Sequence, residues 1–129
     1  LRAKVHIRLI TLAFALFVVG VVLLANQGMI YQVFPFVQEL PGKDKTGHFF
    51  LMGTLAFLTN LSMRGRCLRV SVIRIHVGSL LIMVLVTMEE FSQLFFKARG
   101  FDPWDLLADF LGIFTLGWMG VLLAKRYPA

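Results

Sequence analysis

The chain has 129 residues, of which 58% are hydrophobic and 16% charged, with 13 Lys and Arg against 7 Asp and Glu. A soluble domain is about a quarter charged, so this composition excludes an ordinary soluble domain and a disordered chain, and a single Cys excludes a disulfide scaffold. The net charge of +6 does not indicate a nucleic-acid partner, because a basic patch needs a soluble surface to display it. We predict one domain covering residues 1–129.

Four apolar segments follow one another along the chain. A helix crosses a bilayer core with about 20 mostly apolar residues, and such segments occupy residues 9–25, 47–63, 75–96 and 106–124. The first segment follows a basic stretch, as a signal peptide would. It is long for a signal peptide, however, and Leu23-Leu24-Ala25 is a poor cleavage site, so we expect a retained helix. The sequence therefore predicts an all-α, integral membrane bundle of four transmembrane helices.

The charges sort by side of these spans. Nine bases lie before the first span, in the 64–74 loop or after the fourth span: Arg2, Lys4, Arg8, Arg64, Arg66, Arg69, Arg74, Lys125 and Arg126. An excess of Lys and Arg marks the cytoplasmic side, so we expect both termini in the cytoplasm. The opposite side holds Lys43, Lys45, Lys97, Arg99 and all seven acids.

Two of these acids are expected inside the bilayer. Glu90 stands sixteen residues beyond Arg74, and Asp109 stands sixteen residues before Lys125, which is about 24 Å along a helix. Both would lie in the outer part of a hydrocarbon core about 30 Å thick. An ionisable residue at such a depth needs a partner or a watered cavity, and it is a functional-site hypothesis by default.

Helical spacing brings further polar groups to the same side. Glu90 and Gln93 are i, i+3, while Asp105 and Asp109, like Asp44 and His48, are i, i+4. Arg99 lies in the short connection above the third and fourth spans. The sequence thus predicts one polar cluster of nine residues, namely Asp44, Lys45, His48, Glu90, Gln93, Arg99, Asp102, Asp105 and Asp109.

Two separated segments of the chain resemble the motif of VanZ-like membrane proteins. The first, Asp44-Lys45-Thr46-Gly47-His48, fits D-K-x-x-H at the start of a helix. The second runs from Glu90-Phe91-Ser92-Gln93 through Arg99, Asp102 and Asp105 to Gly112, and fits E-x-x-Q-x5-R-x2-D-x2-D-x3-N-x2-G. The resemblance covers about residues 43–117. Asp109 stands where the family usually has Asn, so it adds negative charge to the cluster or is held protonated.

This resemblance implies a small multi-pass protein of the bacterial cytoplasmic (inner) membrane. The family is named for low-level resistance to teicoplanin, a lipoglycopeptide that binds cell-wall precursors, and no general catalytic activity or cofactor is attached to it. We therefore expect an envelope protein more than an enzyme. Its expected partners are membrane lipids and a lipoglycopeptide or a lipid-linked cell-wall precursor.

The polar cluster has two readings. It is either a structural clamp of ion pairs that joins the helix tops, or a ligand site in which Arg99 and Lys45 bind an amphiphile head group. His48 is either a hydrogen-bonded residue at a helix start or a general base, with Asp44 or Glu90 orienting it and Glu90 as a further acid/base candidate. A metal held by His48, Glu89, Glu90 and Asp109 is disfavoured because it offers one imidazole only, so we expect no metal and no cofactor.

Small residues mark one face of the last span. Ala108 and Gly112, with Gly117 and Gly120 beyond them, predict close helix packing, with homodimerisation as the alternative.

Three functions remain open from the sequence. The first is binding of a lipoglycopeptide or a lipid-linked head group, with a role in envelope modification or resistance. The second is a membrane enzyme that acts on a lipid-linked substrate through His48 or Glu90. The third is an accessory subunit of a larger membrane assembly, with a membrane-protein partner or a second copy of the chain.

Overall fold

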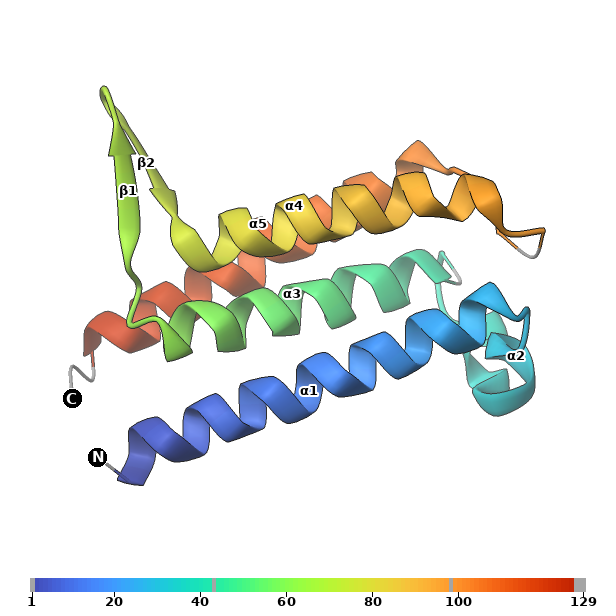
Figure 1. The fold of residues 1–129 in the computed structure, drawn as a ribbon, viewed down its shortest axis with the longest axis horizontal. Coiled ribbons are helices and arrows are strands. Elements are labelled where there is room, and N and C mark those ends of the chain that lie inside the picture. The colour runs from blue at the N-terminus through green and yellow to red at the C-terminus, as the bar shows by residue number, and fades with distance from the viewer. Residues whose placement is uncertain (1, 43, 98, 127–129) are drawn as a thin grey trace.

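The computed structural model describes residues 2–42, 44–97 and 99–126. In this part of the chain the long helices are α1 (Arg2–Asn26), α3 (Asp44–Ser62), α4 (Val77–Ser92) and α5 (Pro103–Arg126) (Figure 1). Short helices α2 (Ile30–Val33) and η1 (Pro35–Glu39) join α1 to α3, and η2 (Gln93–Phe95) extends α4. The predicted helical class is confirmed for most of the chain. Lys43, counted above among the bases, lies outside the described residues.

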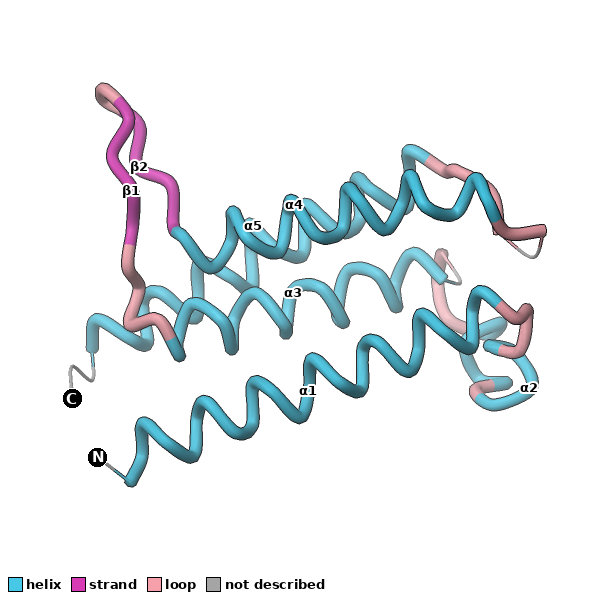
Figure 2. The backbone as a smooth tube through the Cα atoms, in the orientation of Figure 1, coloured by secondary structure: helices cyan, strands magenta, loops and turns pink. Residues whose placement is uncertain are grey.

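The segment between α3 and α4 differs from the prediction. It forms an antiparallel hairpin of β1 (Cys67–Val70) and β2 (Ile73–His76), which projects away from the bundle (Figure 2). Leu68 pairs with Ile75, and Val70 pairs with Ile73. Closely spaced β-branched residues favour a strand over a helix, so α4 begins at Val77 rather than at residue 75. The all-α prediction is wrong for this segment.

Among the residues that the structure describes, three helical segments are long and apolar enough to cross a membrane: Arg2–Asn26, Val77–Phe95 and Pro103–Arg126. Large apolar side chains such as Leu16, Leu85 and Phe114 are exposed along them, as lipid-facing side chains are. The predicted span 47–63 corresponds to α3, which is helical at that place. Its polar residues, including Lys45 and His48, lower its mean hydropathy, so the apolar criterion supports three spans rather than four.

The bundle has two distinct ends (Figure 1). At one, the hairpin end, the start of α1, the end of α5 and the β-hairpin lie together. This end carries the nine bases that the sequence assigned to one side. At the other, the cluster end, α3 and α5 begin and α4 ends, and the short helices α2 and η1 are at this end as well. The separation of charge along the chain is therefore also a separation in space.

Glycines bring α3 and α5 into close contact. A Cβ at Gly112 would collide with the carbonyl of Phe49, and a Cβ at Gly120 would collide with the carbonyl of Phe57. Only a residue without a side chain allows the two backbones to approach this far. The apolar core beside this contact is formed by Val18, Met52, Leu55, Ala56, Ile82, Val86 and Ile113.

A neutral polar group joins three helices towards the hairpin end. The fully buried Asn60 of α3 donates from Nδ2 to Ser79 Oγ (2.8 Å) and to the Gly117 carbonyl (3.0 Å). Its Oδ1 accepts the Ser79 backbone N–H (3.1 Å). A Cβ at Gly78 would collide with Asn60. We call Asn60, Gly78, Ser79, Gly117 and Gly120 the Asn60 junction.

Candidate functional site

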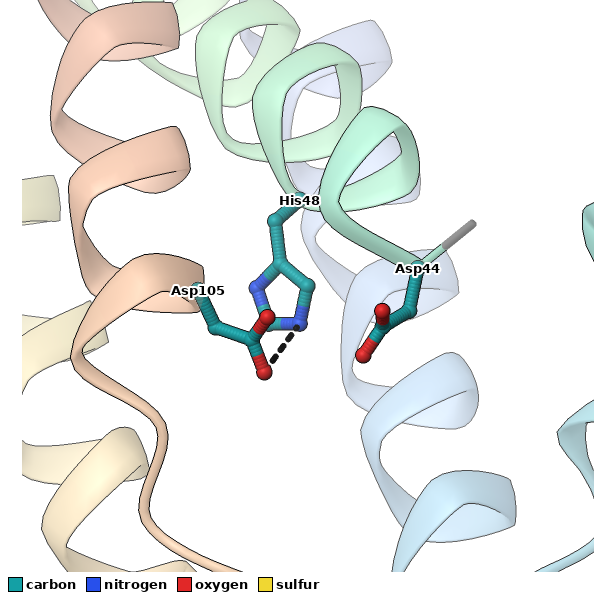
Figure 3. A group of neighbouring side chains, drawn as sticks. All are labelled: Asp44, His48 and Asp105. Atoms are coloured by element: carbon teal, nitrogen blue, oxygen red, sulfur yellow. Dashed lines mark ion pairs between the residues drawn. The ribbon is translucent and has the colours of Figure 1, made fainter. Parts of the chain in front are cut away.

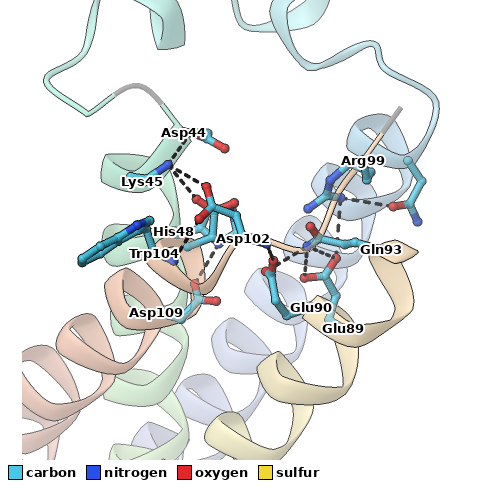
Figure 4. Close-up of polar contacts among 12 residues, drawn as sticks. Asp44, Lys45, His48, Glu89, Glu90, Gln93, Arg99, Asp102, Trp104 and Asp109 are labelled. Atoms are coloured by element: carbon cyan, nitrogen blue, oxygen red, sulfur yellow. Dashed lines mark hydrogen bonds and ion pairs between the residues drawn. The ribbon is translucent and has the colours of Figure 1, made fainter. Parts of the chain in front are cut away.

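Charged side chains from three helices gather at the cluster end (Figure 4). All nine residues of the predicted cluster lie there: Asp44, Lys45, His48, Glu90, Gln93, Arg99, Asp102, Asp105 and Asp109. Their convergence follows from the topology, because α3 and α5 begin where α4 ends. We call these nine residues together with Glu89 the carboxylate cluster.

Lys45 pairs with acids at the starts of α3 and α5. Its Nζ lies 3.1 Å from Asp102 Oδ2, 3.2 Å from Asp105 Oδ1 and 3.8 Å from Asp44 Oδ1. Asp44 and Asp102 are partly exposed, so their pairs with Lys45 are partly solvated and contribute little to stability. Asp105 is buried. Lys45 is therefore its counter-ion at the edge of the bundle.

Asp102 caps α5. Its Oδ1 accepts the Trp104 backbone N–H at 2.9 Å, and Pro103 occupies the first position of the helix. An Asp before a Pro is a favourable helix start, because the carboxylate accepts an otherwise unpaired N–H and Pro has none to lose. The Trp104 N–H, followed by Lys45, lowers the pKa of Asp102 below its ordinary value of 3.8. The cap thus stays ionised.

His48 lies between two acids of α5. Its Nδ1 is 2.9 Å from Asp109 Oδ1 (Figure 4). Its Nε2 is 3.8 Å from Asp105 Oδ2 (Figure 3). The general-base alternative from the sequence named Asp44 or Glu90 as the residue that orients this imidazole, but the hydrogen bond is to Asp109. The rotation of α5 about its axis relative to α3 decides which acid contacts His48. Residue spacing within one helix does not reveal that rotation. His48 is therefore a ring held by Asp109, which is fully buried.

Gln93 and the start of α5 hold Glu90 in place. Gln93 Nε2 donates to Glu90 Oε2 (3.1 Å) and to both oxygens of Glu89 (3.1 and 2.9 Å). Glu90 Oε1 accepts the Asp102 backbone N–H at 2.9 Å. Glu90 is fully buried, and these donors fix its carboxylate. The i, i+3 spacing predicted the contact between Glu90 and Gln93, and Glu89, four residues before Gln93, contacts it as well.

Arg99 ties the 96–102 connection to two helices. Its Nη1 donates to Asn26 Oδ1 of α1 (3.1 Å) and lies 3.5 Å from Glu89 Oε1 of α4. Sequence analysis missed Asn26, and it left Glu89 out of the cluster. The available signal for Asn26 was its place at the very end of an apolar span. The signal for Glu89 was its position four residues before Gln93.

Acids outnumber bases in the carboxylate cluster. The described residues contribute two permanent cations, Lys45 and Arg99, against the acids Asp44, Glu89, Glu90, Asp102, Asp105 and Asp109. Within the described part of the chain, two buried oxygens accept no hydrogen bond: Asp105 Oδ1 and Asp109 Oδ2. The first still has the Lys45 ammonium at 3.2 Å. The two permanent cations therefore do not neutralise all six acids of the cluster. Buried acids without counter-charge are costly.

A cavity of about 630 Å³ lies beside the cluster. Its apolar wall comes from α1, α2, η1 and α3 and includes Phe17, Val21, Tyr31, Phe34 and Leu51. Its polar lining belongs to the cluster end and consists of Asp44, His48, Glu89, Gln93, Arg99, Asp102 and Asp105, with Thr46. An apolar cavity with a few convergent polar groups is the usual form of a small-molecule site. With an apolar wall and a polar end, the cavity fits an amphiphile.

The small residues of α5 lie at the interface with α3. Gly112 faces the Phe49 backbone, as described above, and Ala108, one turn earlier, is partly buried. The face predicted for close packing is thus occupied within the chain.

No family model, curated protein or solved structure matches the chain.

Proposed function

We propose that the chain is a VanZ-like protein of the bacterial cytoplasmic membrane, with four transmembrane helices and both termini in the cytoplasm. The motif residues of the two separated segments, which carry the resemblance, lie together in one cluster (Figure 4). The nine bases at the hairpin end support the orientation. We include α3 as the fourth span because it lies alongside three apolar helices and buries Met52, Leu55 and Ala56.

Its function, in this proposal, is to bind the head group of an amphiphile, either a lipoglycopeptide or a lipid-linked cell-wall precursor, in envelope modification or teicoplanin-type resistance. The observation that carries the proposal is the 630 Å³ cavity, whose apolar wall leads to Arg99 and His48. The carboxylates suit the hydroxyl donors of a glycan, and the Arg99 guanidinium suits a phosphate. The apolar wall suits the lipid chain.

Resistance and binding test this proposal together. Arg99→Ala and Lys45→Ala should each lower teicoplanin resistance in a susceptible host, and should weaken retention of a lipid-linked glycan by the detergent-purified protein. A charge-assisted hydrogen bond contributes about 1.5–3 kcal/mol, so Arg99→Ala should weaken binding about 10-fold or more. Lys97→Ala is the matched control, because Lys97 is exposed in the same connection. Unchanged resistance and retention in both variants, with normal accumulation, would overturn the proposal.

A second candidate function is catalysis on a lipid-linked substrate. The observation that favours it is the 2.9 Å contact between His48 Nδ1 and Asp109 Oδ1 beside the cavity, since an imidazole oriented by a carboxylate is a common general base. Expression of the chain should then create a new lipid product, detectable by mass spectrometry of membrane extracts. Glu90→Gln should abolish that product if Glu90 is the acid. A lipid profile that expression leaves unchanged would remove this candidate.

A further inference from the structure

His48 belongs to two groups of possible metal ligands. One consists of Asp44, His48 and Asp105, and the other of His48, Glu90 and Asp109. In each group one nitrogen or oxygen per residue lies within 4.8 Å of the others. The two groups differ in depth, because Asp44 is partly exposed whereas Glu90 and Asp109 are fully buried.

The two groups also differ in counter-charge. The Lys45 ammonium lies 3.8 Å from Asp44 and 3.2 Å from Asp105, so the shallow group already holds a cation. Neither Lys45 nor Arg99, the described bases of the cluster, makes an ion pair with Glu90 or Asp109. The deep group therefore has no ammonium or guanidinium as a counter-ion. With Glu90 and Asp109 ionised and the imidazole neutral, a divalent cation would balance their two charges.

An unpartnered atom in the deep group also indicates a ligand. Asp109 is fully buried, its Oδ1 contacts His48, and its Oδ2 accepts no hydrogen bond in the described part of the chain. Burial of a carboxylate oxygen without a donor is unfavourable, because the oxygen loses its hydrogen bonds to water. A metal ion bound at this oxygen would replace them.

We propose that His48, Glu90 and Asp109 bind a divalent cation of the Mn²⁺ or Zn²⁺ kind. Ligand atoms about 2.1 Å from such an ion lie roughly 3–4 Å from one another, and one nitrogen or oxygen of each of the three residues already lies within 4.8 Å of the others. One imidazole with two carboxylates suits these ions, whereas Ca²⁺ takes six to eight oxygens. The sequence analysis disfavoured a metal held by His48, Glu89, Glu90 and Asp109 because these residues offer one imidazole only, and the proposed site uses three of the same four residues.

The surrounding donors fit this role. Glu90 receives hydrogen bonds from the Asp102 N–H (2.9 Å) and from Gln93 Nε2 (3.1 Å), which orient its carboxylate before any ion arrives. Such outer donors contribute about 10- to 100-fold to metal affinity. The inference does not rest on the head-group proposal, although a cation here would lie beside the same cavity.

Titration of the purified full-length chain in mild detergent with Mn²⁺ alone tests the site. Electron paramagnetic resonance measures the free ion, and we expect saturable binding of about one ion per chain. Asp109→Asn and Glu90→Gln should each weaken binding by more than about 100-fold, because loss of a ligand exceeds loss of an outer donor. Glu39→Gln is the control, because Glu39 is an exposed acid at the same end and lies outside the cluster.

Three further measurements keep the test decisive. Circular dichroism shows that the variants fold, and Mn²⁺ should raise the melting temperature of the original chain but not that of Asp109→Asn. Competition by Zn²⁺ for the Mn²⁺ supports the proposal as well. Absence of saturable binding of both ions, or binding that neither Asp109→Asn nor Glu90→Gln weakens, would overturn it. The titration contains no amphiphile, so a failure to bind Mn²⁺ does not bear on the head-group proposal. In the same way, an Arg99→Ala variant with unchanged resistance does not bear on the metal site.

Discussion

The Asn60 junction and the carboxylate cluster both join α3, α4 and α5, but they do so by opposite means. At the junction, a neutral amide uses its donors and its acceptor on Ser79 and Gly117, and glycines bring the backbones together. At the cluster, acids outnumber bases, and Asp109 Oδ2 is buried without a donor. The first arrangement is complete in itself. The second leaves charge that a bound group can satisfy, which is why we assign stability to the junction and function to the cluster.

The largest expected effect is at the close contact of α3 and α5. Gly120→Ala places a Cβ against the Phe57 carbonyl, so the helices must separate, and we expect a loss of about 2–3 kcal/mol in the free energy of unfolding. Gly20→Ala in α1 is the control, because a Cβ there meets nothing within 4 Å. Denaturation in mixed detergent measures both variants. Equal stability of the two would contradict the packing described for the junction.

Asn60→Leu should have the next largest effect. Leucine fills a similar volume but leaves the Ser79 N–H without its acceptor in a partly buried place, at a cost of about 1–3 kcal/mol. Thr115→Val is the control, because the Thr115 hydroxyl bonds mainly to Leu111 of its own helix. If Asn60→Leu were as stable as the original chain in the same denaturation assay, the junction would not be the stabilising element.

Much of this fold could be predicted from the sequence because membrane-spanning helices leave strong signals. Runs of apolar residues locate α4 and α5 to within a few residues and the end of α1 to within one, whereas α1 begins seven residues before its predicted span, at Arg2. The hairpin at Cys67–His76 was missed because four-residue strands leave little periodicity, and its four Arg residues within and just before it read as a charged loop. α3 was located, but its polar start lowers its hydropathy below that of its neighbours.

The sequence predicted which residues belong to the candidate site, but it did not predict which of them contact each other between helices. Spacing within one helix identified Glu90 with Gln93, and Asp105 with Asp109. The contact between His48 and Asp109 depends on the rotation of α5 against α3, which glycines at 112 and 120 decide. The sequence contains those glycines, but it does not state which helix they face. The Asn60 junction was missed for the same reason.

A third prediction concerns the shallow side of the cluster. Lys45→Met removes the ammonium that lies 3.2 Å from the buried Asp105. Because Lys45 is partly exposed, we expect a loss of about 1 kcal/mol at neutral pH, less than at the junction. The double variant Lys45→Met/Asp105→Asn should recover this loss, since the unpaired acid is then gone. Failure of the second change to restore stability would contradict the assignment of Lys45 as the counter-ion of Asp105.

The smallest expected effect is the acid titration of the α5 cap. Trp104 N–H and Lys45 lower the pKa of Asp102 below 3.8, so its contribution to folding is complete above that pH. The contribution is lost as the pH falls through the lower pKa of the folded state. Carbon NMR of the labelled Asp102 carboxyl group measures the titration, and Lys45→Met should shift it upward. A midpoint at or above 3.8 in the original chain would contradict the cap.

The most direct test of the contrast is the free energy of unfolding of Asp109→Asn beside that of Asn60→Leu, in metal-free mild detergent. Asparagine keeps the size of Asp109 and a hydrogen bond to His48 but removes a buried carboxylate that makes no ion pair with Lys45 or Arg99. We predict that Asp109→Asn is at least as stable as the original chain, whereas Asn60→Leu loses about 1–3 kcal/mol. If Asp109→Asn lost as much stability as Asn60→Leu, the carboxylate cluster would be a structural clamp, and the division between a stabilising junction and a functional cluster would be wrong.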